Sequence, residues 1–438
     1  MFKITACVKP SVFLKKLIAL NILNLSFFCM LAQAQMTIDI SGVGGQRYPI
    51  SIAAFGNELN AAQPISQIIK NDLERSGKFI QVDPGINIAS ENEAIDFAPI
   101  AERGANALVA GQAILQPSGE FELRFRLYDV ATQQSLGGLV LTGLIDDQRM
   151  IAHKAADFIY EKITQIPGAF ATKIAYVNQV NRNSSQIRIA DSDGANERVV
   201  VTSKSPIISL RWSPKGQHIA YVTLLERPIV NILDLTTGTS KIVSNLPGNN
   251  SSPTWAPDGQ KLLLSLSLFN GLSQIASTNI YGSAPVRLSH SKSIDTESCY
   301  SPDGTSIFFT SDRSGGSQIF QMSAQGEQNS EARRISFEGR NNTSPALSAD
   351  GKWLAYVGRN GNEFNLQLQN LATGQVQTLA QGQLITSPSF APNSQTILYS
   401  KREQNRSMLA IVPIEGGVSN VLPVSSRNAV EPAWGPFH

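Results

Sequence analysis

The sequence predicts an α/β N-terminal domain followed by an all-β six-bladed β-propeller. The main observation is a short motif, called the anchor here, that recurs at steps of 43, 45, 47, 43 and 44 residues. The anchors are residues 212–216 (Trp-Ser-Pro-Lys-Gly), 255–259 (Trp-Ala-Pro-Asp-Gly), 300–304 (Tyr-Ser-Pro-Asp-Gly), 347–351 (Leu-Ser-Ala-Asp-Gly), 390–394 (Phe-Ala-Pro-Asn-Ser) and 434–436 (Trp-Gly-Pro). A sustained repeat of this length, with strand-like segments and no long helical pattern, is typical of a propeller.

Residues 1–34 have the features of a secretory signal peptide. Four lysines and no acidic residue accompany an apolar run over residues 17–31, and residues 32–34 (Ala-Gln-Ala) fit a small-x-small cleavage site. The alternative is an uncleaved anchor helix, but Asn21, Asn24 and Ser26 interrupt a run that is already short for a membrane span. We therefore expect export with cleavage after residue 34.

Cleavage changes the charge and the cysteine content of the chain. The formal net charge falls from +2 to −2 when the four lysines leave, which argues against nucleic-acid binding by bulk charge. Cys7 and Cys29 leave as well, so Cys299 remains alone and no internal disulfide can form. We expect Cys299 to be packed in the core of an exported protein that sheet packing stabilises.

Residues 35–165 are expected to form the α/β domain. Residues 35–45 are a β-prone segment that ends in glycines. The further strands are expected at residues 49–55, 79–82, 107–112, 121–127 and 139–142. Apolar residues at helical spacing predict helices over residues 64–76, near 97–103 and over 147–165. Residues 166–171, which contain Pro167 and Gly168, are expected to be the linker.

Residues 172–438 are expected to form the propeller, with four strands in each repeat. In the anchor, Pro cannot donate to a ladder and Asp-Gly turns the chain; Asn393-Ser394 is expected to substitute, because Asn also enters the left-handed region. The second strands are expected at residues 218–223, 261–265, 306–310, 353–357 and 396–400, and the third at 229–235, 274–279, 318–323, 365–370 and 408–413. The fourth strands are expected to end in residues 241–243, 287–289, 334–336 and 377–379.

The two ends of the repeat array complete each other. Residues 173–177 copy a second strand without an anchor before them, and residues 434–436 are an anchor without a second strand after them. An open array would leave two unpaired sheet edges. We therefore predict that the two half-units form the sixth blade and close the ring.

Catalytic motifs are absent from the sequence. It contains no Gly-x-Ser-x-Gly, Walker or His-Glu-x-x-His motif and no paired cysteines. The aspartates of the anchors are explained by their position in the turns, where Asp is a preferred residue. The histidines of the mature chain, which are expected to be structural, are His153, His218, His290 and His438. We therefore expect no catalytic residue, no cofactor and no bound metal.

Polar residues precede several anchors. They are residues 249–252 (Asn-Asn-Ser-Ser), 294–297 (Ile-Asp-Thr-Glu), 341–343 (Asn-Asn-Thr) and 428–431 (Asn-Ala-Val-Glu). In a propeller such loops lead into the innermost strands, so they should ring one mouth of the channel. A largely uncharged polar ring suits a protein or peptide partner better than a metal or phosphate, although a solvated rim without a partner would have the same composition.

Several motifs are more specific than the repeat. They are residues 40–43 (Ile-Ser-Gly-Val), 73–79 (Leu-Glu-Arg-Ser-Gly-Lys-Phe), 173–177 (Lys-Ile-Ala-Tyr-Val), 309–315 (Phe-Thr-Ser-Asp-Arg-Ser-Gly) and 432–434 (Pro-Ala-Trp). Together with the signal peptide and the anchors, they make the chain similar to the TolB family of the Tol–Pal system over nearly all of its mature length.

The resemblance implies a non-enzymatic periplasmic protein of a trans-envelope machine that maintains the Gram-negative outer membrane and constricts it at cell division. Such proteins bind the peptidoglycan-associated lipoprotein Pal at the propeller mouth and the inner-membrane-anchored TolA through their mature N-terminal segment, and colicins can exploit the same surfaces. The residues assigned to Pal in this way are Asn249, Asn250, Ser251, Ser252, Asp295, Thr296, Asn341, Asn342 and Thr343. Those assigned to TolA are Gln35, Met36, Thr37, Ile38, Asp39, Ile40, Ser41, Gly42 and Val43.

Two other classes of function stay open at this point. A propeller enzyme such as a metal-dependent lactonase would require acidic residues that converge in the channel. A passive scaffold would have a mouth that binds nothing specific. For all three classes we expect a monomer that binds no nucleic acid and does not insert into the membrane once the leader is cleaved.

Overall fold

The computed structural model describes residues 47–437, apart from residues 59–63, 89, 270 and 329–330. The expected signal peptide and the segment 35–45 therefore lie outside the described residues. Within the described part, none of the helices has the length and apolarity needed to cross a membrane.

The N-terminal part is a five-stranded sheet with strand order β2-β1-β3-β4-β5. The strands are β1 (Tyr48–Ile52), β2 (Phe79–Gln81), β3 (Ala107–Leu115), β4 (Glu120–Asp129) and β5 (Ser135–Leu144). β1 pairs in parallel with β2 and β3, and β3, β4 and β5 pair antiparallel. All five expected strands are confirmed, but β5 is longer than the expected residues 139–142, because Gly137 and Gly138 continue the pairing with β4.

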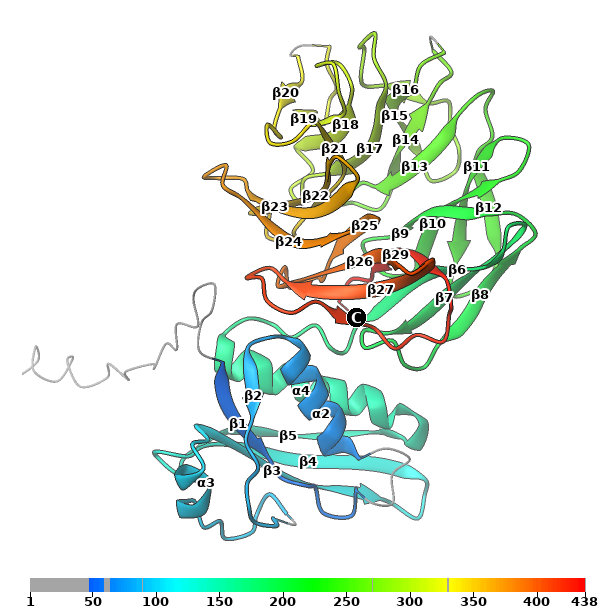
Figure 1. The fold of residues 1–438 in the computed structure, drawn as a ribbon. Coiled ribbons are helices and arrows are strands. Elements are labelled where there is room, and N and C mark those ends of the chain that lie inside the picture. The colour runs from blue at the N-terminus through cyan, green and yellow to red at the C-terminus, as the bar shows by residue number, and fades with distance from the viewer. Residues whose placement is uncertain (1–46, 59–63, 89, 270, 329–330, 438) are drawn as a thin grey trace, which may run out of the picture. The chain divides into compact units, whose positions relative to one another are not determined.

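Three α-helices accompany this sheet, namely α2 (Ile65–Arg75), α3 (Ala98–Glu102) and α4 (Gln148–Thr164), with a 3₁₀ turn η3 (Ile145–Asp147) before α4. Figure 1 shows α2 and α4 side by side over the sheet. The apolar positions that predicted α4 are buried at Ile151, Ala155, Ile159 and Ile163. The apolar face of each long helix packs against one face of the sheet, so the expected α/β arrangement is confirmed.

The remaining chain forms six four-stranded antiparallel sheets, which are the blades of a propeller (Figure 1). The inner strands are β9 (Ile207–Trp212), β13 (Asn250–Trp255), β17 (Asp295–Tyr300), β21 (Asn341–Leu347), β25 (Ile385–Phe390) and β29 (Ala429–Trp434). The second strands are β6 (Lys173–Asn181), β10 (His218–Leu224), β14 (Lys261–Leu266), β18 (Ser306–Ser311), β22 (Trp353–Asn360) and β26 (Thr396–Glu403). The third strands are β7 (Ser184–Asp191), β11 (Pro228–Asp234), β15 (Gln274–Asn279), β19 (Gln318–Ser323), β23 (Glu363–Asn370) and β27 (Arg406–Pro413).

The outer strands vary most in length. They are β8 (Arg198–Ser203), β12 (Ser240–Ser244), β16 (Val286–Arg287), β20 (Arg333–Arg334), β24 (Val376–Gly382) and β28 (Asn420–Val421). Two of the fourth strands are expected to end in residues 287–289 and 334–336. β16 and β20 end earlier, at Arg287 and Arg334. There the hydroxyls of Ser289 and Ser336 accept backbone N–H groups of the third strands, which takes the place of ladder pairing.

The sixth blade is built from both ends of the array, as predicted. Its strand order is β29-β6-β7-β8, with Trp434 opposite Ile174 and Val430 opposite Val177. Residues far apart in the sequence therefore share one sheet, and the ring has no open edge at this point.

The anchor turns correct one sequence expectation. Gly216, Gly259, Gly304 and Gly351 have φ angles of 70°, 70°, 71° and 71°, and in the fifth anchor Ser394, not Asn393, takes this conformation with φ 65°. Asn393 instead takes the place of the aspartate, and its Oδ1 accepts the N–H of Gln395 at 3.1 Å. Ser394 is buried, and its Oγ accepts the N–H of Asp350 at 3.1 Å, which offsets its backbone strain.

Candidate functional site

The six inner strands lie in contact around one channel, each with the next and the last with the first. Each blade repeats the same path, so the first residues of the inner strands lie at one end of the channel and the anchors at the other. We call the first end the loop mouth and the second the anchor mouth. The sequence-predicted residues 249–252, 295–296 and 341–343 lie at the loop mouth.

The structure divides these residues into two groups. Asn250, Asp295 and Asn342 are buried, with exposed fractions of 0%, 0% and 1%. Their side chains hold the loops from inside: Asn250 Oδ1 accepts the N–H of Leu246 at 3.0 Å, and Asn342 Nδ2 donates to the carbonyl of Glu338 at 2.6 Å. These three side chains support the loops and do not face solvent.

The replacement of Asn by Asp at the second of these equivalent positions has a local reason. Both carboxylate oxygens of Asp295 accept from Nη2 of Arg313, at 3.1 and 3.0 Å, and one also accepts from the hydroxyl of Ser291 at 2.8 Å. The buried charge is thus paired and hydrogen-bonded. Sequence reasoning could not separate these residues from their neighbours, because buried and accessible positions alternate within one loop.

The accessible group is uncharged and half-buried or exposed. Its members are Asn249, Ser251, Ser252, Thr296, Asn341 and Thr343. Nδ2 of Asn249 donates to Ser251 Oγ at 2.8 Å and Ser273 Oγ at 3.1 Å, and the hydroxyl of Thr296 donates to Ser265 Oγ at 3.1 Å. Because Asn249 and Thr296 are already held in place, their side chains lose little conformational freedom when a partner binds.

Each inner strand has a β-bulge near its start. The third residue of the strand, or the fourth in β21, has a left-handed backbone there. The positions and φ angles are Ser209 (59°), Ser252 (51°), Glu297 (51°), Ser344 (56°), Ser387 (53°) and Glu431 (53°). The two glutamates belong to blades three apart in the ring. Acidic residues therefore do occur on the channel strands, and a lactonase-like metal site would require their carboxylates to converge.

Both glutamate side chains, however, are bound to the neighbouring blade. Glu431 Oε2 accepts the N–H of Ser209 at 3.0 Å, and Glu297 Oε2 accepts the N–H of Ser344 at 2.8 Å. Burial raises the pKa of Glu431, and the Ser209 N–H opposes this shift. The carboxylates thus connect the blades at mid-channel, and this use of their oxygens argues for a structural role.

His153 belongs to a buried charge network. Its ring is fully buried, with Nδ1 2.6 Å from Asp72 Oδ2, and Nε2 3.8 Å from Asp191 Oδ2 and 4.0 Å from Asp193 Oδ2. Burial alone would lower the pKa of His153, but the charge of Asp72, the hydrogen bond with Asp72 and the nearby carboxylates of Asp191 and Asp193 outweigh it and raise the pKa to about 9.

The same network contains residue types that bind metals. His153, Asp191 and Asp193 bring three such atoms within 4.8 Å of one another. Arg149 pairs with both aspartates and Lys173 with Asp191. Because these cations already neutralise the carboxylates, the group is better suited to a protonated histidine than to a metal ion.

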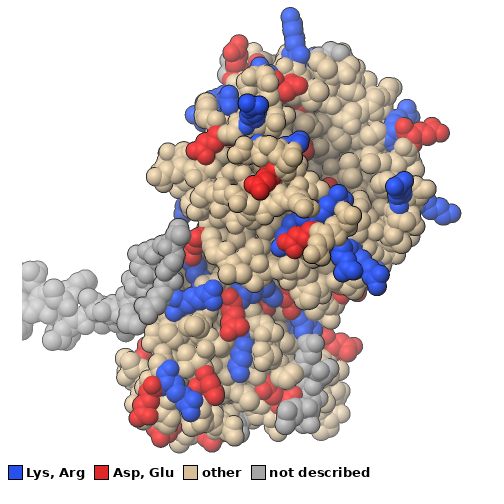
Figure 2. Space-filling model, viewed as in Figure 1, with Lys and Arg blue, Asp and Glu red and all other residues tan. Residues whose placement is uncertain are grey.

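Charged side chains of both signs are interspersed over the face of the molecule shown in Figure 2, with wide uncharged areas between them.

One charged residue that lies inside the channel, Arg211, was not singled out from the sequence. A signal for it exists: the residue before the anchor is Arg211 in the first repeat and Thr254, Cys299, Ala346, Ser389 and Ala433 in the others. At the position before the anchor, only the first repeat has a charged residue.

A closed six-bladed ring after an α/β domain, with an uncharged polar rim at one mouth, defines a two-domain β-propeller protein. Residues 36–136 match the family model of the TolB amino-terminal domain, and residues 160–438 match that of the TolB beta propeller domain. The chain belongs to the TolB family.

Its relatives cover nearly its full length. It is 40% identical over 412 residues to the Tol-Pal system protein TolB of Bordetella pertussis, covering 93% of this chain and 92% of the relative. The corresponding protein of Bordetella bronchiseptica gives 40%, 93% and 91%. Among solved structures, the crystal structure of TolB from Acinetobacter baumannii has a TM-score of 0.82 and 34% identity, with 90% of this chain and 97% of that chain covered.

Proposed function

We propose that this protein is a non-enzymatic, periplasmic binding component of the Tol–Pal system. In this proposal it binds Pal at the loop mouth and TolA through residues 35–43, and it thereby supports outer-membrane integrity and constriction at cell division. Family membership supports the system. The single structural observation that carries the Pal site is the preorganised, uncharged rim that the loops form at one mouth of the channel.

The side chains proposed to touch Pal are the accessible members of the predicted set. Thr296 and Thr343 are half-buried and Asn341 is exposed. Asn250, Asp295 and Asn342 act instead by fixing the loop backbones. A protein partner fits such a rim because hydroxyl and amide groups can exchange water for partner hydrogen bonds without leaving a buried charge unpaired.

Charge introduction at the rim tests the Pal site. In Thr296→Glu and Thr343→Glu, a carboxylate would be desolvated against the partner without a counterion, so we expect Pal to bind at least about tenfold more weakly. The matched control is Thr237→Glu, which adds the same charge on an exposed turn between β11 and β12. Calorimetric titration with the soluble domain of Pal measures the affinity. Wild-type affinity in both rim variants would remove these residues from the interface.

Deletion of residues 35–45 tests the TolA site separately. Ile38, Ile40 and Val43 suit strand addition to a sheet edge, and the glycines that follow suit a tether. We expect the deletion to abolish TolA binding and to leave Pal binding unchanged. If Pal also controls this segment, saturating Pal will lower the affinity for TolA, and linkage requires TolA to lower the affinity for Pal by the same factor.

A further inference from the structure

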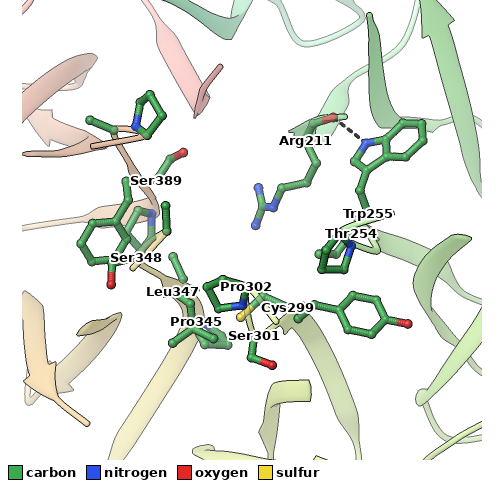
Figure 3. Close-up of a pocket in the computed structure, with 18 residues that line it drawn as sticks. Arg211, Thr254, Trp255, Cys299, Ser301, Pro302, Pro345, Leu347, Ser348 and Ser389 are labelled. Carbon is green, nitrogen blue, oxygen red and sulfur yellow. Dashed lines mark hydrogen bonds between the residues drawn. The ribbon is translucent and has the colours of Figure 1, made fainter. Parts of the chain in front are cut away.

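A cavity of about 340 Å³ opens at the anchor mouth, at the opposite end of the channel from the proposed Pal site. Its wall is largely apolar and includes Pro302, Pro345, Pro388 and Phe390 from successive inner strands and anchors. Figure 3 shows the side chain of Arg211 reaching into the cavity between these groups. A volume of this size lies at the lower end of the range of small-molecule sites.

Arg211 is the only charged residue among the 18 residues that line the cavity. Its Nη1 donates to the carbonyl of Leu210 at 2.7 Å, and its own carbonyl accepts the indole N–H of Trp255 at 3.1 Å. Within the described part of the chain, no carboxylate forms an ion pair with its guanidinium. The backbone that carries this cation is thus fixed, while most of its donors face the cavity.

The two acids of the channel do not form ion pairs with Arg211. Glu431 is close enough for its pKa to respond to the Arg211 charge, but Oε2 of Glu431 is held by the N–H of Ser209. Glu297 is bound to Ser344 in the same way. Because neither carboxylate forms an ion pair with Arg211, the half-buried guanidinium is available to an anion that supplies two acceptor oxygens.

We propose that this cavity binds a carboxylate carried on a small apolar body. The carboxylate accepts two parallel hydrogen bonds from Arg211, and the apolar part packs against the prolines and Phe390. A phosphate is a poorer fit because it needs more donors than one guanidinium offers. The hydroxyls of Ser301 and Ser348 are committed to Asp303 and Asp350 at 2.5 Å each.

Titration with matched probes tests the proposal. The probes are 3-phenylpropionate, which represents a free organic acid, N-acetylphenylalanine, which represents the C-terminus of a chain, and N-acetylphenylalanine amide, the neutral counterpart. We expect at least one acid to bind the full mature chain about tenfold or more tightly than the amide, and to shift the guanidinium nitrogen resonances of Arg211. Which acid binds better identifies the source of the ligand.

The variant Arg211→Gln should abolish the preference for the acid, while Arg211→Lys, which keeps the charge but loses the planar fork, should retain part of it. Thermal unfolding of each variant checks its fold, and the comparison of acid with amide in the wild-type chain is independent of the variants. Equal binding of acid and amide, unchanged acid binding in Arg211→Gln, or no binding of either acid at tens of millimolar would overturn the proposal.

Discussion

The indole N–H of Trp434 donates to the hydroxyl of Thr172 at 2.9 Å, across a separation of 262 residues. Two other anchor tryptophans make similar contacts between blades, Trp212 to the carbonyl of Ala433 and Trp255 to that of Arg211, both at 3.1 Å. The contact of Trp434 lies within the sixth blade, where it joins β29 to the residue before β6, while the contact of Trp212 joins the first inner strand to the last. The last strand is therefore part of the fold and not a tail.

Deletion of residues 431–438 should unfold the propeller cooperatively. It removes Ala433 and Trp434, which pair with Ala175 and Ile174, and so exposes most of the edge of β6. Calorimetry should show the main transition lowered or lost. Deletion of residues 437–438 alone is the control, because it leaves β29 intact, and it should change the transition little. An unchanged transition in the longer deletion would contradict the role of closure.

The rim residue Asn249 should be more important for stability than its half-buried place in a loop suggests. Its Nδ2 donates to Ser251 Oγ, Ser265 O and Ser273 Oγ at 2.8, 3.2 and 3.1 Å. In Asn249→Asp a carboxylate oxygen would face the Ser265 carbonyl, so we expect a loss of roughly 1–2 kcal/mol in the free energy of unfolding. Chemical unfolding measures it, with Thr296→Glu as the comparison. A loss below about 0.5 kcal/mol would show that the loop adapts.

The sequence predicts most of this fold because the repeat states the same pattern several times. Apolar positions and turns predicted the strands of each blade. The incomplete units at residues 173–177 and 434–436 predicted that the two ends of the array pair and close the ring. It could not predict which loop residues face solvent, since Asn249 and Asn250 are chemically identical neighbours with different burial. That difference depends on Leu246 and Ser244, whose approach to Asn250 requires the folded blade.

The anchor turns predict a measurable cost for losing glycine. Gly304 has φ 71°, and an added Cβ would only make ordinary van der Waals contact with Pro257 at 3.6 Å, so Gly304→Ala should cost about 1 kcal/mol of stability through the left-handed backbone. The reciprocal variant Ser394→Gly relieves that strain but loses the bond to the Asp350 N–H, so its net effect should stay within about 0.5 kcal/mol. Urea unfolding distinguishes the two. Equal costs would mean that φ does not decide the residue here.

Cys299 should react slowly with thiol reagents although it lines the anchor-mouth cavity. Burial raises the pKa of its thiol to about 12, and the charge of Arg211 offsets this only partly. At pH 8 the folded protein should therefore react at least about a hundredfold more slowly with a disulfide reagent than the same chain in urea. Similar rates in both states would show that the thiol is accessible and ionised.

The stability of the protein should fall between pH 6.5 and pH 9 because of His153. In the folded state Asp72, Asp191 and Asp193 face its ring, and they raise its pKa from about 6.5 to about 9 against the effect of burial. A histidine with a raised pKa stabilises the folded state fully below pH 6.5, and this stabilisation is lost as the pH rises through 9. The expected loss across the window is on the order of 3 kcal/mol.

Urea unfolding at pH 6, 7.5 and 9 measures this effect, and His153→Gln should remove it, because the variant lacks the proton that the aspartates stabilise. The variant should therefore be less stable than the wild type at pH 6, with the difference shrinking towards pH 9. His218→Gln is the control, since this histidine lies outside the network at the start of β10, and it should leave the pH dependence intact. The same pH dependence in wild type and His153→Gln would assign it to other groups.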